Sequence, residues 1–402
     1  RKDGSLLNYT EIPSRLRNPL VNRLKIMSNL DISVKQVPQN GKIKFRQFGP
    51  LDIELRVATV PTAGGVEDVV LRILASGKPI PLDKLGLSKR NFEALKLAIA
   101  NPYGLFFVCG PTGSGKTTTL HSVLGYLNTP DMKIWTAEDP VEITQKGLRQ
   151  VQMNPKAGLT FAIAMKAFLR ADPDVIMVGE MRDKETVSTG IEASLTGHLV
   201  FATLHTNSAP ESIIRLLDMG MDPFNFADAL LGILAQRLAR RLCKCKEPHV
   251  ATPEEMSALI DEYSAELINT ESWGAVVDEA TGEARRLTGD AEAKRSEIAQ
   301  KKKAELLEQW TKEFGNEKGE LILYSAKGCE VCGNTGYKGR MGLHELLIGS
   351  DKIKKDIQNH ARVAKMFATC MDDGMRTLKQ DGIEKVLQGI TDMLQVRAVC
   401  IK

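Results

Sequence analysis

The fold of this chain is decided by one stretch, Gly110-Pro111-Thr112-Gly113-Ser114-Gly115-Lys116-Thr117. It matches the pattern G-x-x-x-x-G-K-T, in which glycines turn backbone N–H groups inward so that they can bind phosphate oxygens. The apolar residues 105–109 before it are typical of a strand, and residues 118–124 after it favour a helix. A strand, a glycine loop and a helix in this order predict a nucleoside triphosphate site, because a helix N-terminus also favours an anion.

Two residues of this stretch have individual chemical roles. We expect Lys116 to reach the β- and γ-phosphates and the Thr117 hydroxyl to ligate Mg²⁺. A chance glycine turn is the alternative interpretation, and the flanking strand and helix signals argue against it. The predicted nucleotide-binding residues are Gly110, Pro111, Thr112, Gly113, Ser114, Gly115, Lys116, Thr117 and Thr118.

The length and charge of the chain limit the remaining possibilities. A chain of 402 residues is too long for one ordinary domain, so two or three domains are expected. The formal net charge of +4 is small for this size, which argues against strong sequence-independent binding of nucleic acid. No apolar run has the length needed to span a bilayer. Because the first residue is Arg1, we expect the chain to be part of a longer protein.

The N-terminal part of the sequence predicts a small α+β domain over residues 1–76. Helix signals come first, and three alternating runs of strand type follow at residues 43–48, 51–57 and 69–74. Two prolines indicate a linker over residues 77–87. We therefore expect residues 88–402 to form the second domain.

The second domain alternates short apolar strands with helices, which predicts an α/β fold with a mostly parallel, buried sheet. The candidate strands are residues 105–109, 133–136, 174–178 and 199–204. Sheets of this kind bind ligands at the carboxyl ends of their strands. The loops at those ends hold Glu138, Glu180 and His205, so we expect them to share one active site with the glycine loop.

Glu180 follows the apolar run at residues 175–178, which is the Walker B arrangement. A carboxylate at this place can bind Mg²⁺, or orient or deprotonate the attacking water. Glu138 is a second candidate for the same work, and the sequence leaves open which of the two activates water. We interpret His205 as a sensor of the γ-phosphate and His198 as a structural residue.

Two further segments have helical character. Residues 228–242 favour a helix, because Leu230, Leu234 and Leu238 recur at helical spacing and arginines gather near its end. Residues 351–402 predict C-terminal helices that pack against the sheet domain.

Four cysteines form two close pairs, Cys243 with Cys245 and Cys329 with Cys332. Two such pairs predict a tetrahedral Cys₄ zinc site, within an element that covers about residues 240–340. The C-x-C spacing of the first pair is tighter than usual, and a disulfide or reduced structural thiols are the alternatives. The polar residues 247–320 between the pairs are interpreted as an inserted, solvated helical excursion.

Together these motifs closely resemble the secretion ATPase superfamily, which contains the motors of type II secretion and of type IV pili. The matching segments are the Walker A residues 110–117, the Asp box at 138–140, the Walker B region at 170–183 and the His box at 196–207. The cysteine pairs resemble the tetracysteine zinc element of the assembly and export branch. The resemblance covers nearly the whole chain.

This resemblance implies a RecA-like P-loop ATPase domain preceded by the second N-terminal domain of the family. It implies a homo-hexameric ring that is cytoplasmic, lies at the cytoplasmic face of the inner membrane and acts on an inner-membrane platform protein. The implied cofactors are ATP, Mg²⁺ and Zn²⁺. Arg56 and Arg72 fall on positions at which the N-terminal domain of the family contacts the phosphates. Without the resemblance we would interpret both as ordinary strand charges.

The resemblance therefore predicts an ATP-hydrolysing motor that powers type IV pilus assembly. A type II secretion ATPase is the nearest alternative, and no local motif separates the two. A nucleic-acid translocase on the same fold would show turnover stimulated by DNA or RNA, and the small net charge argues against it. A nucleotide-gated scaffold, which binds ATP and barely hydrolyses it, is the third alternative.

Overall fold

The computed structural model describes residues 6–51, 53–74, 79–278 and 283–400 of the chain. The chain divides into two compact units. The smaller unit contains Arg1–Pro79 and Pro140–Lys146, and the larger contains Ile80–Asp139 and Gly147–Lys402. The chain thus leaves the larger unit directly after Asp139 and returns to it at Gly147.

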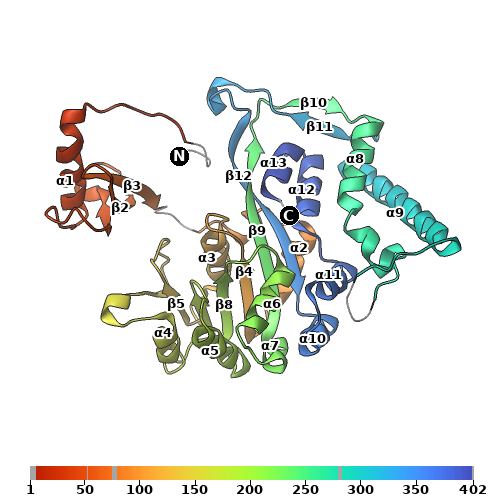
Figure 1. The fold of residues 1–402 in the computed structure, drawn as a ribbon, viewed down its shortest axis with the longest axis horizontal. Helices are drawn as coiled ribbons and strands as arrows, with labels where there is room; N and C mark the ends of the chain where they lie inside the picture. Colours follow the sequence, from red (N-terminus) through yellow and green to blue (C-terminus); the bar gives the residue numbers. More distant parts are fainter. Residues whose placement is uncertain (1–5, 52, 75–78, 279–282, 401–402) are drawn as a thin grey trace. The chain divides into compact units, whose positions relative to one another are not determined.

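The described residues of the smaller unit include helix α1 and an antiparallel three-stranded sheet in the order β1-β2-β3. Its elements are α1 (Arg17–Met27), β1 (Gln39–Lys44), β2 (Glu54–Thr62) and β3 (Val66–Leu74). Helix α1 and strands β2 and β3 are labelled in Figure 1. Strand β1 ends earlier than the sequence predicts, because Phe45–Gln47 forms a 3₁₀ turn. Lys25 of α1 is buried and fixes the helix to β3, with its Nζ 2.6 Å from Glu67 Oε1.

The larger unit is built on a seven-stranded sheet. In spatial order its strands are β12 (Tyr337–Ile348), β9 (Leu230–Leu242), β4 (Gly104–Cys109), β8 (Leu199–Leu204), β7 (Val175–Val178), β5 (Ile134–Glu138) and β6 (Arg149–Gln152). All neighbouring strands pair in parallel except β12, which pairs antiparallel with β9. This confirms the predicted α/β fold with a mostly parallel sheet.

Both faces of this sheet are buried, and the P-loop strand β4 shows why. Leu105 and Phe107 belong to one hydrophobic core and Phe106 and Val108 to the other, because side chains alternate along a strand. The second core is covered by α2 (Lys89–Ile99) and α3 (Lys116–Leu127). The first is covered by α4 (Phe161–Phe168), α5 (Lys184–Leu195), α6 (Ala209–Asp218) and α7 (Pro223–Ala229), together with helices from the C-terminal part.

The prediction of a helix over residues 228–242 is wrong, because most of this segment forms strand β9. The short helix α7 ends at Ala229, and β9 then runs between β4 and β12 (Figure 1). A strand that is buried on both faces is apolar almost throughout, so its leucines can match helical spacing by coincidence. Gly232 allows β12 to approach β9 closely, since a Cβ at this position would lie 2.8 Å from the Leu347 carbonyl oxygen of β12.

The polar excursion begins and ends in a two-stranded antiparallel ribbon of β10 (Glu247–Val250) and β11 (Ile322–Ser325). Its longest helix, α9 (Asp290–Phe314), agrees with the predicted solvated character, because Trp310 is the one buried residue of this fully described helix. The other helix, α8 (Pro253–Ser264), is packed instead. Its Tyr263 hydroxyl donates to Glu384 at 2.8 Å, and this anchors the excursion on the C-terminal helices.

The C-terminal part is helical, as predicted. Its helices are α10 (Asp351–Gln358), α11 (Val363–Asp372), α12 (Leu378–Leu387) and α13 (Met393–Val399). Helix α12 packs against β12 and α8. Over the described ranges, no helix combines the length and the apolar character needed to cross a membrane.

Candidate nucleotide and zinc sites

The glycine loop connects the end of β4 to the start of α3, where the sequence places it. Gly113 has φ 81° and Gly115 has φ 92°, a left-handed conformation that residues with a Cβ rarely adopt. Gly110 is required by space, since a Cβ there would lie 2.6 Å from both Ser114 Oγ and the Gln236 carbonyl oxygen. The loop therefore has the backbone that a phosphate cradle needs.

Lys116 is the first residue of α3 and folds back over this loop. Its Nζ donates to the Gly110 carbonyl at 2.7 Å and to the Pro111 carbonyl at 3.1 Å. Burial lowers the pKa of Lys116, and the charge of Glu180 acts in the opposite direction. Strands β4 and β7 both pair in parallel with β8, so the end of β7 lies at the same edge of the sheet as the P-loop.

Strand β9 also contacts the glycine loop and helps to fix its conformation. The buried Gln236 donates from Nε2 to the Ser114 carbonyl at 2.6 Å. Sequence reasoning missed this contact because the segment was predicted to be a helix. The alternation of strand side chains would have placed Gln236 on the same face as Leu234, once β9 had been recognised as a strand.

Glu180 directly follows β7 and Gly179, and the structure brings it together with His205. Its Oε1 lies 3.2 Å from His205 Nε2, and its Oε2 accepts a hydrogen bond from Arg182. The loop is held to β8 by Thr203, whose hydroxyl donates to the Gly179 carbonyl at 2.5 Å. The side chain of Glu180 is 15% exposed, so its carboxylate can still meet a ligand or water.

Glu138 ends β5 and occupies a different environment. It is buried, and its carboxylate accepts hydrogen bonds from Thr136 at 2.6 Å and Gln150 at 2.9 Å and pairs with His121 at 3.1 Å. Burial acts to raise the pKa of Glu138, but these partners, His121 foremost, outweigh it and lower the pKa. The two candidate carboxylates therefore differ: Glu138 is fully engaged within the protein, and Glu180 is more open.

Arg56 and Arg72 lie in the smaller unit, directly opposite each other on β2 and β3. Lys42 of β1 stands opposite Arg56 on the other side. Residues paired in this way share one face of a sheet, so the three cations form a row across it. Like charges directly opposite each other are destabilising. The register therefore places both predicted arginines side by side in the smaller unit.

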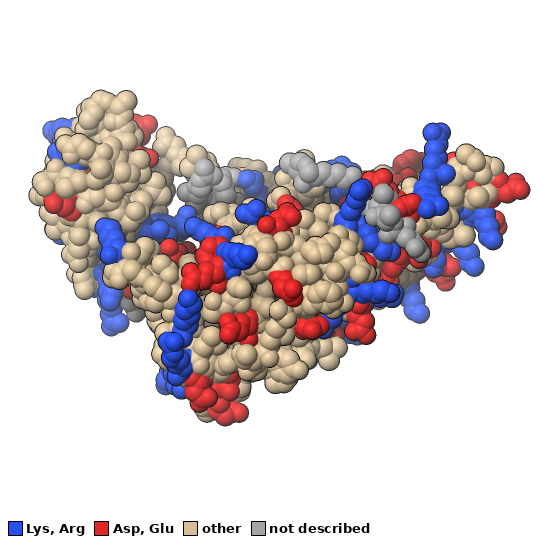
Figure 2. Space-filling view, turned by 60° about the horizontal axis from the view of Figure 1, so that its bottom comes forward, with Lys and Arg blue, Asp and Glu red and all other residues tan. Residues whose placement is uncertain are grey.

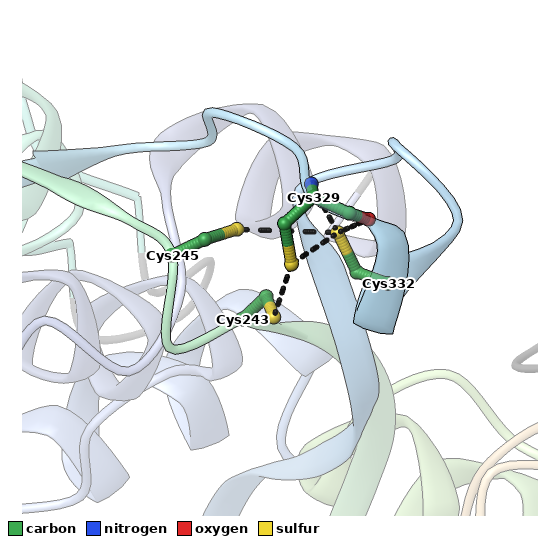
Figure 3. Close-up of side chains that lie close together, drawn as sticks. All are labelled: Cys243, Cys245, Cys329 and Cys332. Carbon is green, nitrogen blue, oxygen red and sulfur yellow. Dashed lines mark hydrogen bonds between the residues drawn. The ribbon is translucent and has the colours of Figure 1, made fainter.

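The four cysteines converge although Cys245 and Cys332, for example, are 87 positions apart in the chain (Figure 3). Cys243 and Cys245 follow β9, and Cys329 and Cys332 precede β12. The antiparallel pairing of β9 with β12 brings Leu242 opposite Tyr337, which places both pairs at the same end of the sheet.

The spacing of the sulfur atoms fits a zinc ion. The Sγ atoms of Cys243 and Cys329 are 4.0 Å apart, those of Cys245 and Cys332 are 3.9 Å apart, and those of Cys329 and Cys332 are 3.7 Å apart. Tetrahedral ligands with Zn–S bonds of about 2.3 Å are about 3.8 Å apart, whereas a disulfide requires about 2.05 Å. The C-x-C pair thus reaches the same cluster as the C-x-x-C pair.

The backbone around Cys332 favours a thiolate, which is the form that binds metal. Desolvation acts to raise its pKa, but hydrogen bonds from the N–H groups of Cys329 and Gly336 outweigh this and lower the pKa to about 6. The corresponding N···Sγ distances are 3.1 Å and 3.3 Å.

The fold and the site define a P-loop protein with a Walker-type carboxylate and a separate four-cysteine cluster. The chain belongs to the family of type II/IV secretion system proteins, whose model matches residues 1–398.

Relatives in both branches of this family are similar to the chain. The type IV pilus assembly ATPase PilB of Thermus thermophilus is 42% identical, over 100% of this chain and 39% of that protein. PilB of Myxococcus xanthus is 40% identical, over 98% of this chain and 61% of that protein. The type II secretion system protein E of Dickeya dadantii is 39% identical, over 98% of this chain and 68% of that protein. The chain thus spans only part of these relatives, and the identities do not separate pilus assembly from type II secretion.

Solved structures confirm the fold. The pilus retraction motor PilT with bound ADP matches with a TM-score of 0.57 and 24% identity, over 91% of this chain and 78% of that chain. The Legionella pneumophila ATPase DotB matches with a TM-score of 0.63 and 20% identity, over 98% of this chain and 86% of that chain.

Proposed function

We propose that the chain is the catalytic part of a hexameric, Mg²⁺-dependent ATPase motor that powers type IV pilus assembly. The observation that carries the proposal is the meeting of Glu180 and His205 at the edge of the sheet that also holds the P-loop, in a chain of the type II/IV secretion family. The similarity to two PilB proteins supports the pilus assignment. A type II secretion ATPase is the alternative, supported by a relative of nearly equal identity.

Nucleotide binding follows from the loop geometry. The phosphates would lie against the N–H groups of the glycine loop, and Lys116 would exchange its bonds to the Gly110 and Pro111 carbonyls for phosphate oxygens. The Thr117 hydroxyl would hold Mg²⁺, because oxygen atoms are the ligands that this ion prefers. When bound, the Mg²⁺ ion would neutralise part of the negative charge of the phosphates.

We assign activation of the attacking water to Glu180. A general base needs a free lone pair within reach of the water, and Glu180 is partly exposed, whereas Glu138 is buried with three partners. His205 pairs with the Glu180 carboxylate and can therefore respond to the γ-phosphate. The cationic row that contains Arg56 and Arg72 would stabilise charge that develops in the transition state.

The mechanical role is the finer part of the proposal. We propose that closure and opening of the smaller unit on the nucleotide drive the ring against an inner-membrane platform protein at the cytoplasmic face. The zinc ion would hold together the ends of β9 and β12, from which the polar excursion extends. In Figure 2, Lys and Arg are interspersed with Asp and Glu over the described residues of the face drawn, which is not the pattern of a nucleic-acid track.

The deciding experiment is steady-state ATP turnover by the purified chain, alone, with a pilus platform protein, with a type II secretion platform protein and with DNA or RNA. Stimulation by the pilus platform alone supports the proposal. Stimulation by the type II platform alone transfers the chain to secretion, and stimulation by nucleic acid alone rejects the motor for a translocase. Nucleotide binding without turnover under any of these conditions would indicate a scaffold.

A further inference from the structure

Side chains from three segments converge on the Glu138 carboxylate. His121 of α3 lies 3.1 Å from Oε2, while Thr136 of β5 and Gln150 of β6 donate to Oε1 at 2.6 Å and 2.9 Å. Glu138 is 3% exposed, and His121 and Thr136 are fully buried. A buried charge persists only where such partners compensate for lost solvation, so this cluster fixes one position of the carboxylate.

His121 connects this carboxylate to the phosphate-binding end of α3. The helix begins at Lys116, and His121 lies five residues later, about 7.5 Å along the helix axis. An α-helix of three turns moves as a rigid element, so a shift of its phosphate-binding end also moves His121.

Gln150 connects the same carboxylate to the segment that leaves the larger unit. After Asp139 the chain enters Pro140–Lys146, which belongs to the smaller unit, and it returns at Gly147. Glu138 lies just before this departure and Gln150 just after the return. The Glu138–Gln150 hydrogen bond and the pairing of β5 with β6 therefore hold together the two ends of the loop that contains this segment.

We infer that His121 is a positioning residue, which fixes Glu138 to the P-loop helix and links phosphate binding there to the segment that enters the smaller unit. In this arrangement Glu138 does not take the proton from water. It holds α3, β5 and β6 in one geometry, and loss of the His121 contact releases the loop that follows β5. The inference rests on the proposed ATPase function.

The test compares His121→Leu, which removes the hydrogen-bonding ring, with His121→Gln, whose side-chain amide can still donate to Glu138. We expect His121→Leu to bind ADP with unchanged affinity and to lower kcat by about 10- to 100-fold, the range set by loss of one charge-assisted hydrogen bond. His121→Gln should restore most of kcat. His198→Leu is the matched control, because the His198 ring hydrogen-bonds the Ala193 carbonyl at 2.9 Å and the substitution should leave kcat within about twofold.

A wild-type kcat in folded His121→Leu overturns the inference, as does equal loss of kcat in His121→Leu and His121→Gln. If His121→Leu does not fold, Thr136→Val decides, because it removes another bond to Glu138 with little change of shape. A normal kcat in Thr136→Val would then reject the positioning role, and a fall of about tenfold at constant KM would support it. Absence of turnover in the unaltered chain would instead reject the proposed function, so the two failures can be told apart.

Discussion

Glu180 Oε1 and His205 Nε2 lie 3.2 Å apart because β7 and β8 are parallel neighbours that end at the same edge of the sheet. Strand β4, which leads into the P-loop, also pairs in parallel with β8 and ends at this edge. The arrangement leads to a first prediction, which separates binding from hydrolysis.

Glu180→Gln should bind ATP and hydrolyse it about 10²- to 10⁴-fold more slowly, because the amide cannot accept a proton from water. Lys116→Ala should lose nucleotide binding itself, since the cation on the phosphates is gone. Equilibrium binding of a fluorescent ATP analogue and single-turnover hydrolysis measure the two effects. Unchanged turnover in Glu180→Gln would remove Glu180 from the catalytic role.

The cationic row on the smaller unit gives a second prediction. Arg56→Ala and Arg72→Ala should each lower kcat by up to about 10³-fold with a smaller effect on ATP affinity, because the arginines are expected to act on transition-state charge. Arg46→Ala, on the turn after β1, is the control for removal of a cation from the same unit. Equal effects of all three substitutions would indicate a general electrostatic contribution instead of two specific contacts.

The cysteine cluster gives a third prediction. The purified chain should contain about one zinc ion, and Cys332→Ser should reduce the metal content and the thermal stability together, because structural zinc contributes directly to folding. Cys400→Ser is the matched control, since Cys400 lies outside the cluster. Metal analysis and thermal unfolding provide the two measurements, and a well-folded chain with far less than one zinc ion would contradict the assignment.

The sequence predicted the elements whose signal is local. The strand–loop–helix around Lys116 and the apolar strands β7 and β8 needed no long-range information, and the parallel sheet then brought Glu180 and His205 together. Strand β9 was missed because its neighbours β4 and β12, far away in the sequence, decide its conformation.

The network around Glu138 shows a second limit of sequence reasoning. No spacing rule links His121, Glu138 and Gln150, because their contact depends on how α3, β5 and β6 pack in three dimensions. The two carboxylates therefore looked equivalent in the sequence, and only their neighbours distinguish them.

A buried carboxylate on β12 gives the last prediction, which concerns pH. Glu345 is 3% exposed, and its Oε1 accepts a hydrogen bond at 2.8 Å from the N–H of Ala209, the first residue of α6. Burial raises the pKa of Glu345 to about 7 from an ordinary value of 4.5. The folded chain therefore binds the carboxyl proton of Glu345 more tightly than the unfolded chain does.

The stabilisation from this proton is fully present below pH 4.5 and is lost as the pH rises to about 7. A shift of that size corresponds to about 3 kcal/mol of unfolding free energy. Glu345→Gln keeps the acceptor and has no charge to bury, so its stability relative to the unaltered chain should increase by up to about 3 kcal/mol between pH 4.5 and 7. Urea unfolding across this range measures the difference, with the exposed Glu185→Gln as control. A difference that stays constant with pH would show that Glu345 ionises in the folded chain as it does in the unfolded one.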